Sequence, residues 1–242
     1  MLAMPHRLIA KLDLFTRLSD EEQQALREVT GYHRQTKVRE DLGPIRLILD
    51  GWACRYKQVA DGRRQIMALL LPGDLCDPQI DVLRAMDHSI GAVTCVTLAE
   101  IAHDRLADLA AQYPRVGAAL AWEAQVGAAI QREWTVNLGQ RDAVERLAHL
   151  FCELSVRLRG IGLVRGDSYE MPLRQTDLAA ATGLTSVHVN RSLQTLRAQG
   201  WIVLRGRCLT ILDSEALQHS ALFDPSYLHA DRAGAHPHTD DR

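Results

Sequence analysis

The stretch Gln175–Gln194, QTDLAAATGLTSVHVNRSLQ, decides the fold of its half of the chain. Its residues fit two short helices joined by a tight turn. Gly183 can adopt the left-handed backbone conformation that ends a helix, and Thr185 or Ser186 can cap the helix that follows. Ala179 is small enough to let the second helix cross closely over the first. The pattern predicts a helix-turn-helix.

The second helix of this motif has two distinct faces. Its buried face consists of Val189, Leu193 and Leu196, at positions i, i+4 and i+7. The opposite face carries side chains able to contact base edges in a major groove. These are Val187, Asn190, Arg191 and Gln194.

A hairpin is predicted directly after the motif. WIVLRGRCLTIL, residues 201–212, alternates apolar residues around Arg205-Gly206-Arg207, which is typical of a β-hairpin wing whose tip contacts phosphate. We therefore expect DNA contacts from Arg174, Thr185, Ser186, Val187, His188, Asn190, Arg191, Gln194, Arg205 and Arg207.

Composition and local charge support a nucleic-acid contact at the helix-turn-helix. The chain has 242 residues, 47% of them hydrophobic, and a formal net charge of -2, enough for two compact domains. Residues 165–212 hold six arginines against three acidic residues, a local net charge of +3. Five scattered cysteines without C-x-x-C spacing indicate reduced thiols and no zinc or other metal site. With no signal peptide and no long apolar run, we expect a cytoplasmic protein that does not bind membranes.

The first half of the chain predicts a sensor domain over residues 1–103. Residues 1–30 have helical periodicity, with a capping box at Ser19 and Glu22. Short apolar runs separated by turns then indicate a compact β-barrel or sandwich, and Asp61-Gly62 is the strongest hairpin signal. The fold class is α+β.

A long helix and a hinge are predicted over residues 104–139. Its apolar stripe is typical of a helix that pairs with a second copy of itself, although a helix packed only on its own barrel has the same pattern. The stripe consists of Val116, Leu120, Gly127, Ile130, Trp134 and Leu138. Gly139 is the expected hinge before a DNA-binding domain at 140–217, and residues 225–242 are predicted to be disordered.

The order of barrel, long helix, hinge and winged helix-turn-helix resembles the Crp/Fnr family of bacterial transcription regulators over about residues 8–217. ADGRRQI at 60–66, LPGDL at 71–75 and TDLAAATGLTSVHVNRSLQTL at 176–196 carry the resemblance. It implies a cyclic-nucleotide-binding-like barrel (jelly roll) and a homodimer that binds a palindromic site in double-stranded DNA. RNA polymerase is the implied partner if the protein is an activator.

The resemblance also places an effector pocket near the LPGDL turn. Its expected residues are Gly73, Asp74, Leu75, Cys76, His88 and Ser89. His88 stands where cyclic-AMP-binding members have a phosphate-binding arginine, and neutral imidazole cannot supply that charged fork, so cyclic AMP is not expected. No cysteine precedes Cys54, which argues against an iron-sulfur cluster. Haem or pH sensing at His88 and redox sensing at Cys76 stay open, but inert buried side chains are the commoner reading.

Val187 marks a departure within the recognition helix. Many family members have a glutamate there that accepts a hydrogen bond from cytosine, whereas valine favours a thymine methyl group. The sequence contains no G-x-S-x-G, P-loop or H-E-x-x-H motif, so we expect no enzyme. The alternative function is a small-molecule-binding module whose C-terminal domain docks a protein partner. That reading would require an apolar stripe where this helix is polar.

Overall fold

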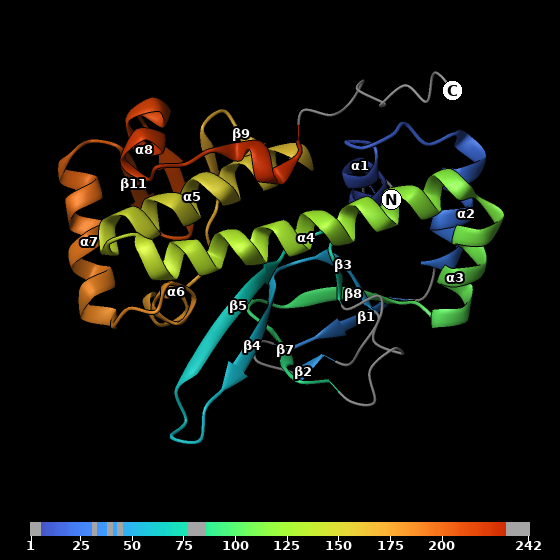
Figure 1. Ribbon diagram of the computed structural model, residues 1–242, viewed down its shortest axis with the longest axis horizontal. Coiled ribbons are helices and arrows are strands. Elements are labelled where there is room, and N and C mark those ends of the chain that lie inside the picture. Colours follow the sequence, from blue (N-terminus) through green and yellow to red (C-terminus); the bar gives the residue numbers. More distant parts are fainter. Residues whose placement is uncertain (1–5, 31–32, 38–40, 43–45, 77–85, 231–242) are drawn as a thin grey trace, which may run out of the picture.

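The computed structural model describes residues 6–30, 33–37, 41–42, 46–76 and 86–230. Helix α4, Pro114–Gln140, runs along the long axis of the molecule (Figure 1). The N-terminal helices lie at one end of α4, the C-terminal domain lies at the other, and the sheets of the sensor domain lie along one side. The predicted α+β architecture is confirmed. Among the described residues, no helix is both long and apolar enough to cross a bilayer.

Two short helices and a third, later one gather at the N-terminal end of α4. They are α1 (Arg7–Leu12), α2 (Asp20–Val29) and α3 (His103–Gln112). The predicted capping box starts α2: Ser19 N donates to Glu22 Oε2 at 2.7 Å, and Glu22 N donates to Ser19 Oγ at 3.3 Å. Leu8, Leu12 and Leu26 share a buried core with Val116 of α4.

The sensor domain contains two four-stranded antiparallel sheets. One has the order β1 (His33–Thr36), β8 (Val96–Glu100), β3 (Arg46–Asp50), β6 (Leu75–Cys76). The other has the order β2 (Asp41–Leu42), β7 (Ser89–Ala92), β4 (Ala53–Gln58), β5 (Arg64–Leu70). Ile48 and Leu98 of the first sheet share a core with Ala53 and Ile90 of the second, so the sheets pack face to face.

The β4–β5 hairpin forms where Asp61-Gly62 predicts it. Gly62 has φ +86°, a conformation that favours glycine in a tight turn. Strand β5 is an edge of its sheet, and helix α6 (Gln175–Thr182) of the C-terminal domain packs on it. A helix of one domain therefore lies against an edge strand of the other.

The C-terminal domain is built on α5 (Ala143–Gly160), with Phe151 fully buried at its centre. Helices α6, α7 (Ser186–Ala198) and α8 (Ser214–Ser220) pack on α5, and a small antiparallel sheet completes the domain. Its strands are β9 (Val164–Arg165), β10 (Ser168–Glu170), β11 (Ile202–Arg205) and β12 (Cys208–Ile211), in the order β11-β12-β10-β9. Tyr169 donates from its hydroxyl to Phe151 O at 2.8 Å and so joins this sheet to α5.

The junction between α4 and α5 is held by several contacts. Helix α4 continues through Gly139, and α5 starts two residues after Arg141 with its own capping box at Asp142. Arg141 Nε donates to Ala221 O at 2.9 Å, and Arg146 Nε donates to Arg141 O at 2.8 Å. The predicted hinge is therefore tied to α5 and to the segment after α8.

The segment after α8 differs from the expectation of disorder from residue 225 onward. Pro225–Leu228 forms a short 3-10 helix, η2, on α4 and α5, and Leu228 is buried. Tyr227 donates from its hydroxyl to Glu153 Oε2 at 3.0 Å. A short apolar segment can therefore order here, because α4 and α5 together supply the surface that covers it. Residues 231–242 of the predicted tail lie outside the described residues.

Candidate DNA-binding site

The turn of the helix-turn-helix forms as its sequence predicts. Gly183 has φ +65° at the end of α6, and Leu184 N donates to Ala179 O at 3.1 Å. Thr185 caps α7 by accepting a hydrogen bond at Oγ1 from His188 N at 3.2 Å. Between the two candidate caps of the sequence, the structure uses Thr185, and Ser186 becomes the first residue of α7.

Helix α7 buries one face and leaves the other open. Val189, Leu193 and Leu196 are at most 2% exposed, whereas Val187 is 68% exposed. Among the described residues, the side chains of Asn190, Arg191 and Gln194 are exposed and form no hydrogen bond or ion pair. These groups are available to an external ligand. Helix α7 contains no acidic residue, which suits an approach to DNA.

The wing places its two arginines at an exposed tip. Arg205 pairs with Cys208 at the end of the β11–β12 ladder, and Gly206 has φ +59° between the arginines. Arg207 O accepts a hydrogen bond from Met171 N at 2.8 Å, which fixes the tip against β10. The two guanidinium groups are thus presented on a constrained turn, a suitable arrangement for contacting phosphate.

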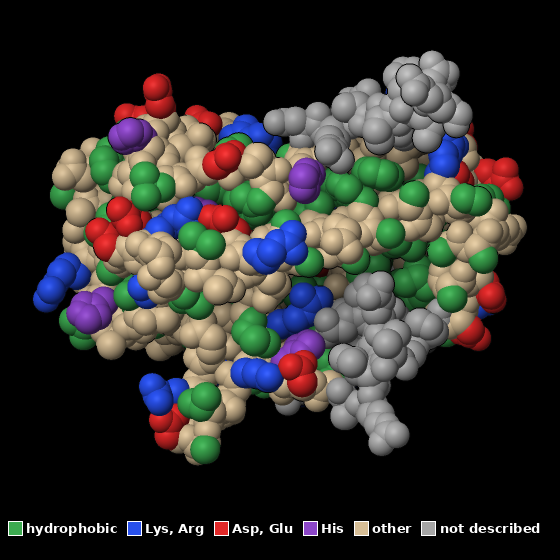
Figure 2. All heavy atoms as spheres, viewed as in Figure 1, with side chains coloured by type: hydrophobic (Ala, Val, Ile, Leu, Met, Phe, Trp, Pro, Cys, Tyr) green, Lys and Arg blue, Asp and Glu red, His purple; other side chains and the backbone are tan. Residues whose placement is uncertain are grey.

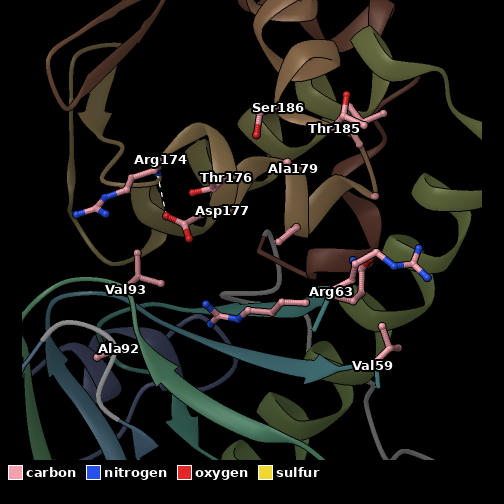
Figure 3. Close-up of a pocket in the computed structure, with 15 residues that line it drawn as sticks. Val59, Arg63, Ala92, Val93, Arg174, Thr176, Asp177, Ala179, Thr185 and Ser186 are labelled. Carbon is pink, nitrogen blue, oxygen red and sulfur yellow. Dashed lines mark hydrogen bonds between the residues drawn. The ribbon is translucent and has the colours of Figure 1, made fainter. Parts of the chain in front are cut away.

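The beginning of α7 faces a cleft of about 770 Å³ between the C-terminal domain and the β4–β5 hairpin. Figure 3 shows Arg174, Thr185 and Ser186 on one side of this cleft and Val59 and Arg63 on the other. Arg174 begins α6, where its backbone N donates to Asp177 Oδ2 at 3.0 Å. Three of the ten predicted DNA-contacting residues therefore face the sensor domain of their own chain.

The predicted effector residues do not all border one cavity. A cavity of about 670 Å³ between the sensor domain, α4 and α5 is lined by Asp74, Leu75 and His88 but not by Gly73, Cys76 or Ser89. Cys76 is fully buried, and Gly73, with φ +96°, donates from its N to Ile48 O at 2.7 Å. These two residues serve the packing and the turn of the sandwich.

His88 is already paired with its neighbour. Its Nδ1 lies 2.7 Å from Asp87 Oδ1, and Lys57 Nζ donates to Asp87 Oδ2 at 3.0 Å. The hydrogen bonds from His88 and then Lys57 lower the pKa of Asp87 to about 2. Among the described residues, no three His, Cys, Asp or Glu side chains are grouped as a metal site would require.

Burial raises the pKa of Cys54 to about 11, so this thiol is protonated.

The apolar stripe of α4 faces inward. Val116 is buried with the N-terminal helices, and Ile130 and Trp134 are buried in the core shared with α5. Leu120, Gly127 and Leu138 are partly buried. The three buried members of the stripe therefore pack on their own chain, but on the N-terminal helices and the C-terminal domain and not only on the barrel. The opposite face of α4 is exposed at Ala118, Ala121, Gln125, Arg132, Thr135, Val136 and Gly139.

Sequence reasoning missed a buried polar cluster that links the two domains. Glu153 of α5 is fully buried, and its Oε2 accepts from Trp134 Nε1 at 2.9 Å and from the Tyr227 hydroxyl. Arg157 of α5 reaches Asp74 of the sensor domain at 2.9 Å. Glu153 and Arg157 at i and i+4 were the available signal, but this spacing also fits an ordinary surface pair.

Comparison with known proteins agrees with this geometry. The Crp-like helix-turn-helix domain family matches residues 145–220. The nitrogen fixation regulation protein FixK of Bradyrhizobium diazoefficiens is 30% identical over 167 residues, covering 69% of each chain. The transcriptional activator protein FnrL of Cereibacter sphaeroides is 26% identical over 198 residues, covering 78% of this chain and 79% of FnrL.

A solved structure shows the same fold. FixK2 from Bradyrhizobium japonicum superposes with a TM-score of 0.68 at 22% identity, covering 78% of this chain and 96% of that one. The matched domain, the relatives and the exposed α7 face lead to one conclusion: the chain belongs to the Crp/Fnr family, as a DNA-binding transcription regulator of that type.

Proposed function

We propose that this regulator binds as a homodimer to a two-fold symmetric DNA site, with α7 of each copy in a major groove. The observation that carries the proposal is the open face of α7, where the side chains of Asn190, Arg191 and Gln194 have no partner among the described residues. An arginine can donate two hydrogen bonds to guanine O6 and N7, and asparagine can pair with adenine. We assign guanine to Arg191, and adenine or phosphate to Asn190.

Five of the remaining predicted residues are assigned to the DNA backbone. Arg174, Thr185, Ser186, Arg205 and Arg207 are exposed at helix starts or at the wing tip, where backbone N–H groups and guanidinium groups suit phosphate. Such contacts set the register of the protein on the duplex. Their loss is expected to weaken binding to all sequences equally and to reduce the salt dependence.

Selection from randomised duplexes at fixed, near-physiological salt tests the base assignment. We expect a two-fold symmetric site for the unaltered protein and loss of preference at one base pair of each half-site for Arg191→Ala. Arg17→Ala is the matched control, because it removes an exposed arginine from the sensor domain. Equal loss of selectivity in both variants would contradict the assignment to Arg191.

The proposed dimer uses the open face of α4 and not the predicted stripe. The helix is about 40 Å long, and no described segment covers its outer face (Figures 1 and 2). That face carries Ala118 and Ala121, small side chains that allow a second helix to approach closely. Ala121→Arg is expected to shift the mass in sedimentation towards that of a monomer. A dimer unaffected by this change would place the interface elsewhere.

For the effector, we propose the 670 Å³ cavity beside α4, whose walls are mainly apolar side chains such as Leu69, Trp122 and Ile130. His88 stands at the position of the phosphate-binding arginine of cyclic-AMP-binding members. It shares the carboxylate of Asp87 with Lys57. Cyclic AMP is therefore expected to produce no heat of binding in titration calorimetry. Saturable binding of cyclic AMP would overturn this reading of the cavity.

A further inference from the structure

Arg157 links the DNA-binding domain to the turn that follows β5. Its Nη2 lies 2.9 Å from Asp74 Oδ2 and donates to Leu69 O, also at 2.9 Å. Its Nη1 donates to Glu153 Oε1 at 3.1 Å. The side chains of Arg157 and Asp74 are 13% and 8% exposed. The Arg157–Asp74 ion pair is thus nearly enclosed at the boundary between the two domains. Its two residues are 83 positions apart in the sequence.

The carboxylate of Asp74 also pairs with a second cationic side chain. Lys11 Nζ lies 2.6 Å from Asp74 Oδ1 and 2.7 Å from Glu123 Oε1, so α1 and α4 join the same network. Asp74 Oδ2 further accepts from Leu71 N at 2.9 Å. Although burial alone would raise it, the charges of Lys11 and Arg157 hold the pKa of Asp74 below its usual value. Asp74 is therefore an anion held between cations from two parts of the chain.

The charged groups of Arg157 and Asp74 can both regain water if the domains separate. Lys11, Asp74, Glu123 and Arg157 all line the 670 Å³ cavity between the domains, so the network borders space that solvent can enter. Burying an ion pair costs desolvation that offsets most of its attraction. Opening the pair by moving the domains apart therefore costs far less than deleting one partner inside a closed interface. This property suits a reversible contact.

In the same arrangement the sensor domain stands close to the end of α7 that would enter DNA. The cleft of about 770 Å³ that separates Thr185 and Ser186 from the β4–β5 hairpin has the volume of a small-molecule site. It is too small for a duplex, whose major groove alone is about 12 Å wide. Contacts of α6 with β5 maintain this proximity.

We propose that Arg157 and Asp74 form an intramolecular clasp that holds the DNA-binding domain against the sensor domain, and that DNA binds more tightly once the clasp opens. The inference rests on the proposed DNA-binding function of α7. If the clasped form predominates, the apparent affinity for DNA falls by the ratio of clasped to open molecules.

Replacement of Arg157 tests the clasp, because the expected change in DNA affinity is opposite to the one that loss of a positive charge ordinarily causes. Loss of a positive charge from a DNA-binding domain ordinarily weakens binding. We expect Arg157→Met instead to bind the selected site about tenfold more tightly, because it favours the open form. Asp74 keeps Lys11 as its partner in this variant, and Glu153 keeps its hydrogen bonds from Trp134 and Tyr227.

The matched control lies on the same helix. Arg159→Met removes an exposed arginine whose contacts are long, to Asp167 Oδ1 at 3.8 Å and to Gly166 O at 3.4 Å. This variant should bind DNA as tightly as the unaltered protein or more weakly. Asp74→Asn should tighten binding as Arg157→Met does, and the double variant should add little, because both changes break one contact. Unchanged or weaker binding by folded Arg157→Met and Asp74→Asn would overturn the clasp.

A measurement on the unaltered protein covers the case in which both variants fail to fold. Hydrogen exchange in β5 is expected to become faster when the selected DNA is added, because α6 leaves this edge strand. Exchange that stays the same or slows in β5 would refute domain separation. Failure of the unaltered protein to select any site would count against the proposed function, whereas site selection without these responses counts against the clasp alone.

Discussion

Helices α4 and α7 are both amphipathic, yet they use their faces differently. In α7 the apolar face packs within its own domain, and the polar face stays open at Asn190 and Arg191. The apolar stripe of α4 predicts a contact either with a second copy or with the chain's own barrel, and Ile130 and Trp134 pack on the chain's own C-terminal domain. Periodicity identifies which face of a helix is buried, but it cannot identify what covers that face.

The largest expected effect tests the covering of α4. Trp134→Ala should lower the free energy of unfolding by about 3–5 kcal/mol, because it removes a large buried side chain and a hydrogen bond to Glu153. Urea denaturation at two protein concentrations measures the loss, which should be independent of concentration. A loss that disappeared at high concentration would instead place Trp134 in a dimer seam. Leu212→Ala, at a 58% exposed position just after β12 and away from α4, should stay within about 0.5 kcal/mol.

The next effect tests the open face of α7. Val187→Glu should change the preferred base pair at one position of each half-site towards cytosine, by about 1–3 kcal/mol, because a carboxylate accepts from the cytosine amino group. Competition binding with base-substituted duplexes measures this change. The unfolding free energy should hardly move, since Val187 is 68% exposed. An unaltered base preference would remove Val187 from the DNA interface.

A smaller effect separates two glycines, Gly183 at the predicted helix end and Gly139 at the predicted hinge. Gly183→Ala should cost about 1–2 kcal/mol of stability, because φ is +65° there and a Cβ atom would lie 3.1 Å from Leu138 Cδ2. Gly139, inside α4, has no atom within 4 Å of an added Cβ, so Gly139→Ala should be neutral or stabilising. Thermal unfolding compares the two. Destabilisation by Gly139→Ala would support the hinge predicted at this residue.

The smallest effect concerns the start of each helix. Thr185→Ala should destabilise α7 by about 1 kcal/mol, because it removes the acceptor for His188 N. Helix α4 starts at Pro114 without any side-chain cap on Tyr113, so packing and the fixed φ of this proline set its first turn. Hydrogen exchange of the first turn of α7 measures the loss of the cap. Unchanged protection in Thr185→Ala would show that packing also controls this end of α7.

Several features of the fold follow from neighbouring residues and could be predicted. The Ser19–Glu22 capping box, the turn at Asp61-Gly62 and the left-handed Gly183 each depend on backbone geometry within a few positions. The candidate DNA-binding face was predictable for the same reason, since Val187, Asn190 and Arg191 share one side of α7 through helical spacing alone. Local sequence is sufficient where the deciding contacts are local.

The sequence by itself thus determined most of the elements, the buried faces of α4 and α7, and the residues that we propose to contact DNA. Only the tertiary structure decided that α4 packs on its own chain, that residues 225–228 order as η2, and that Arg157 meets Asp74. These outcomes depend on which surfaces meet when distant segments fold together. Which surfaces pack together depends on the burial of apolar area and on the desolvation of charges. Both are properties of the assembled interface, so they cannot be deduced from a short stretch of residues.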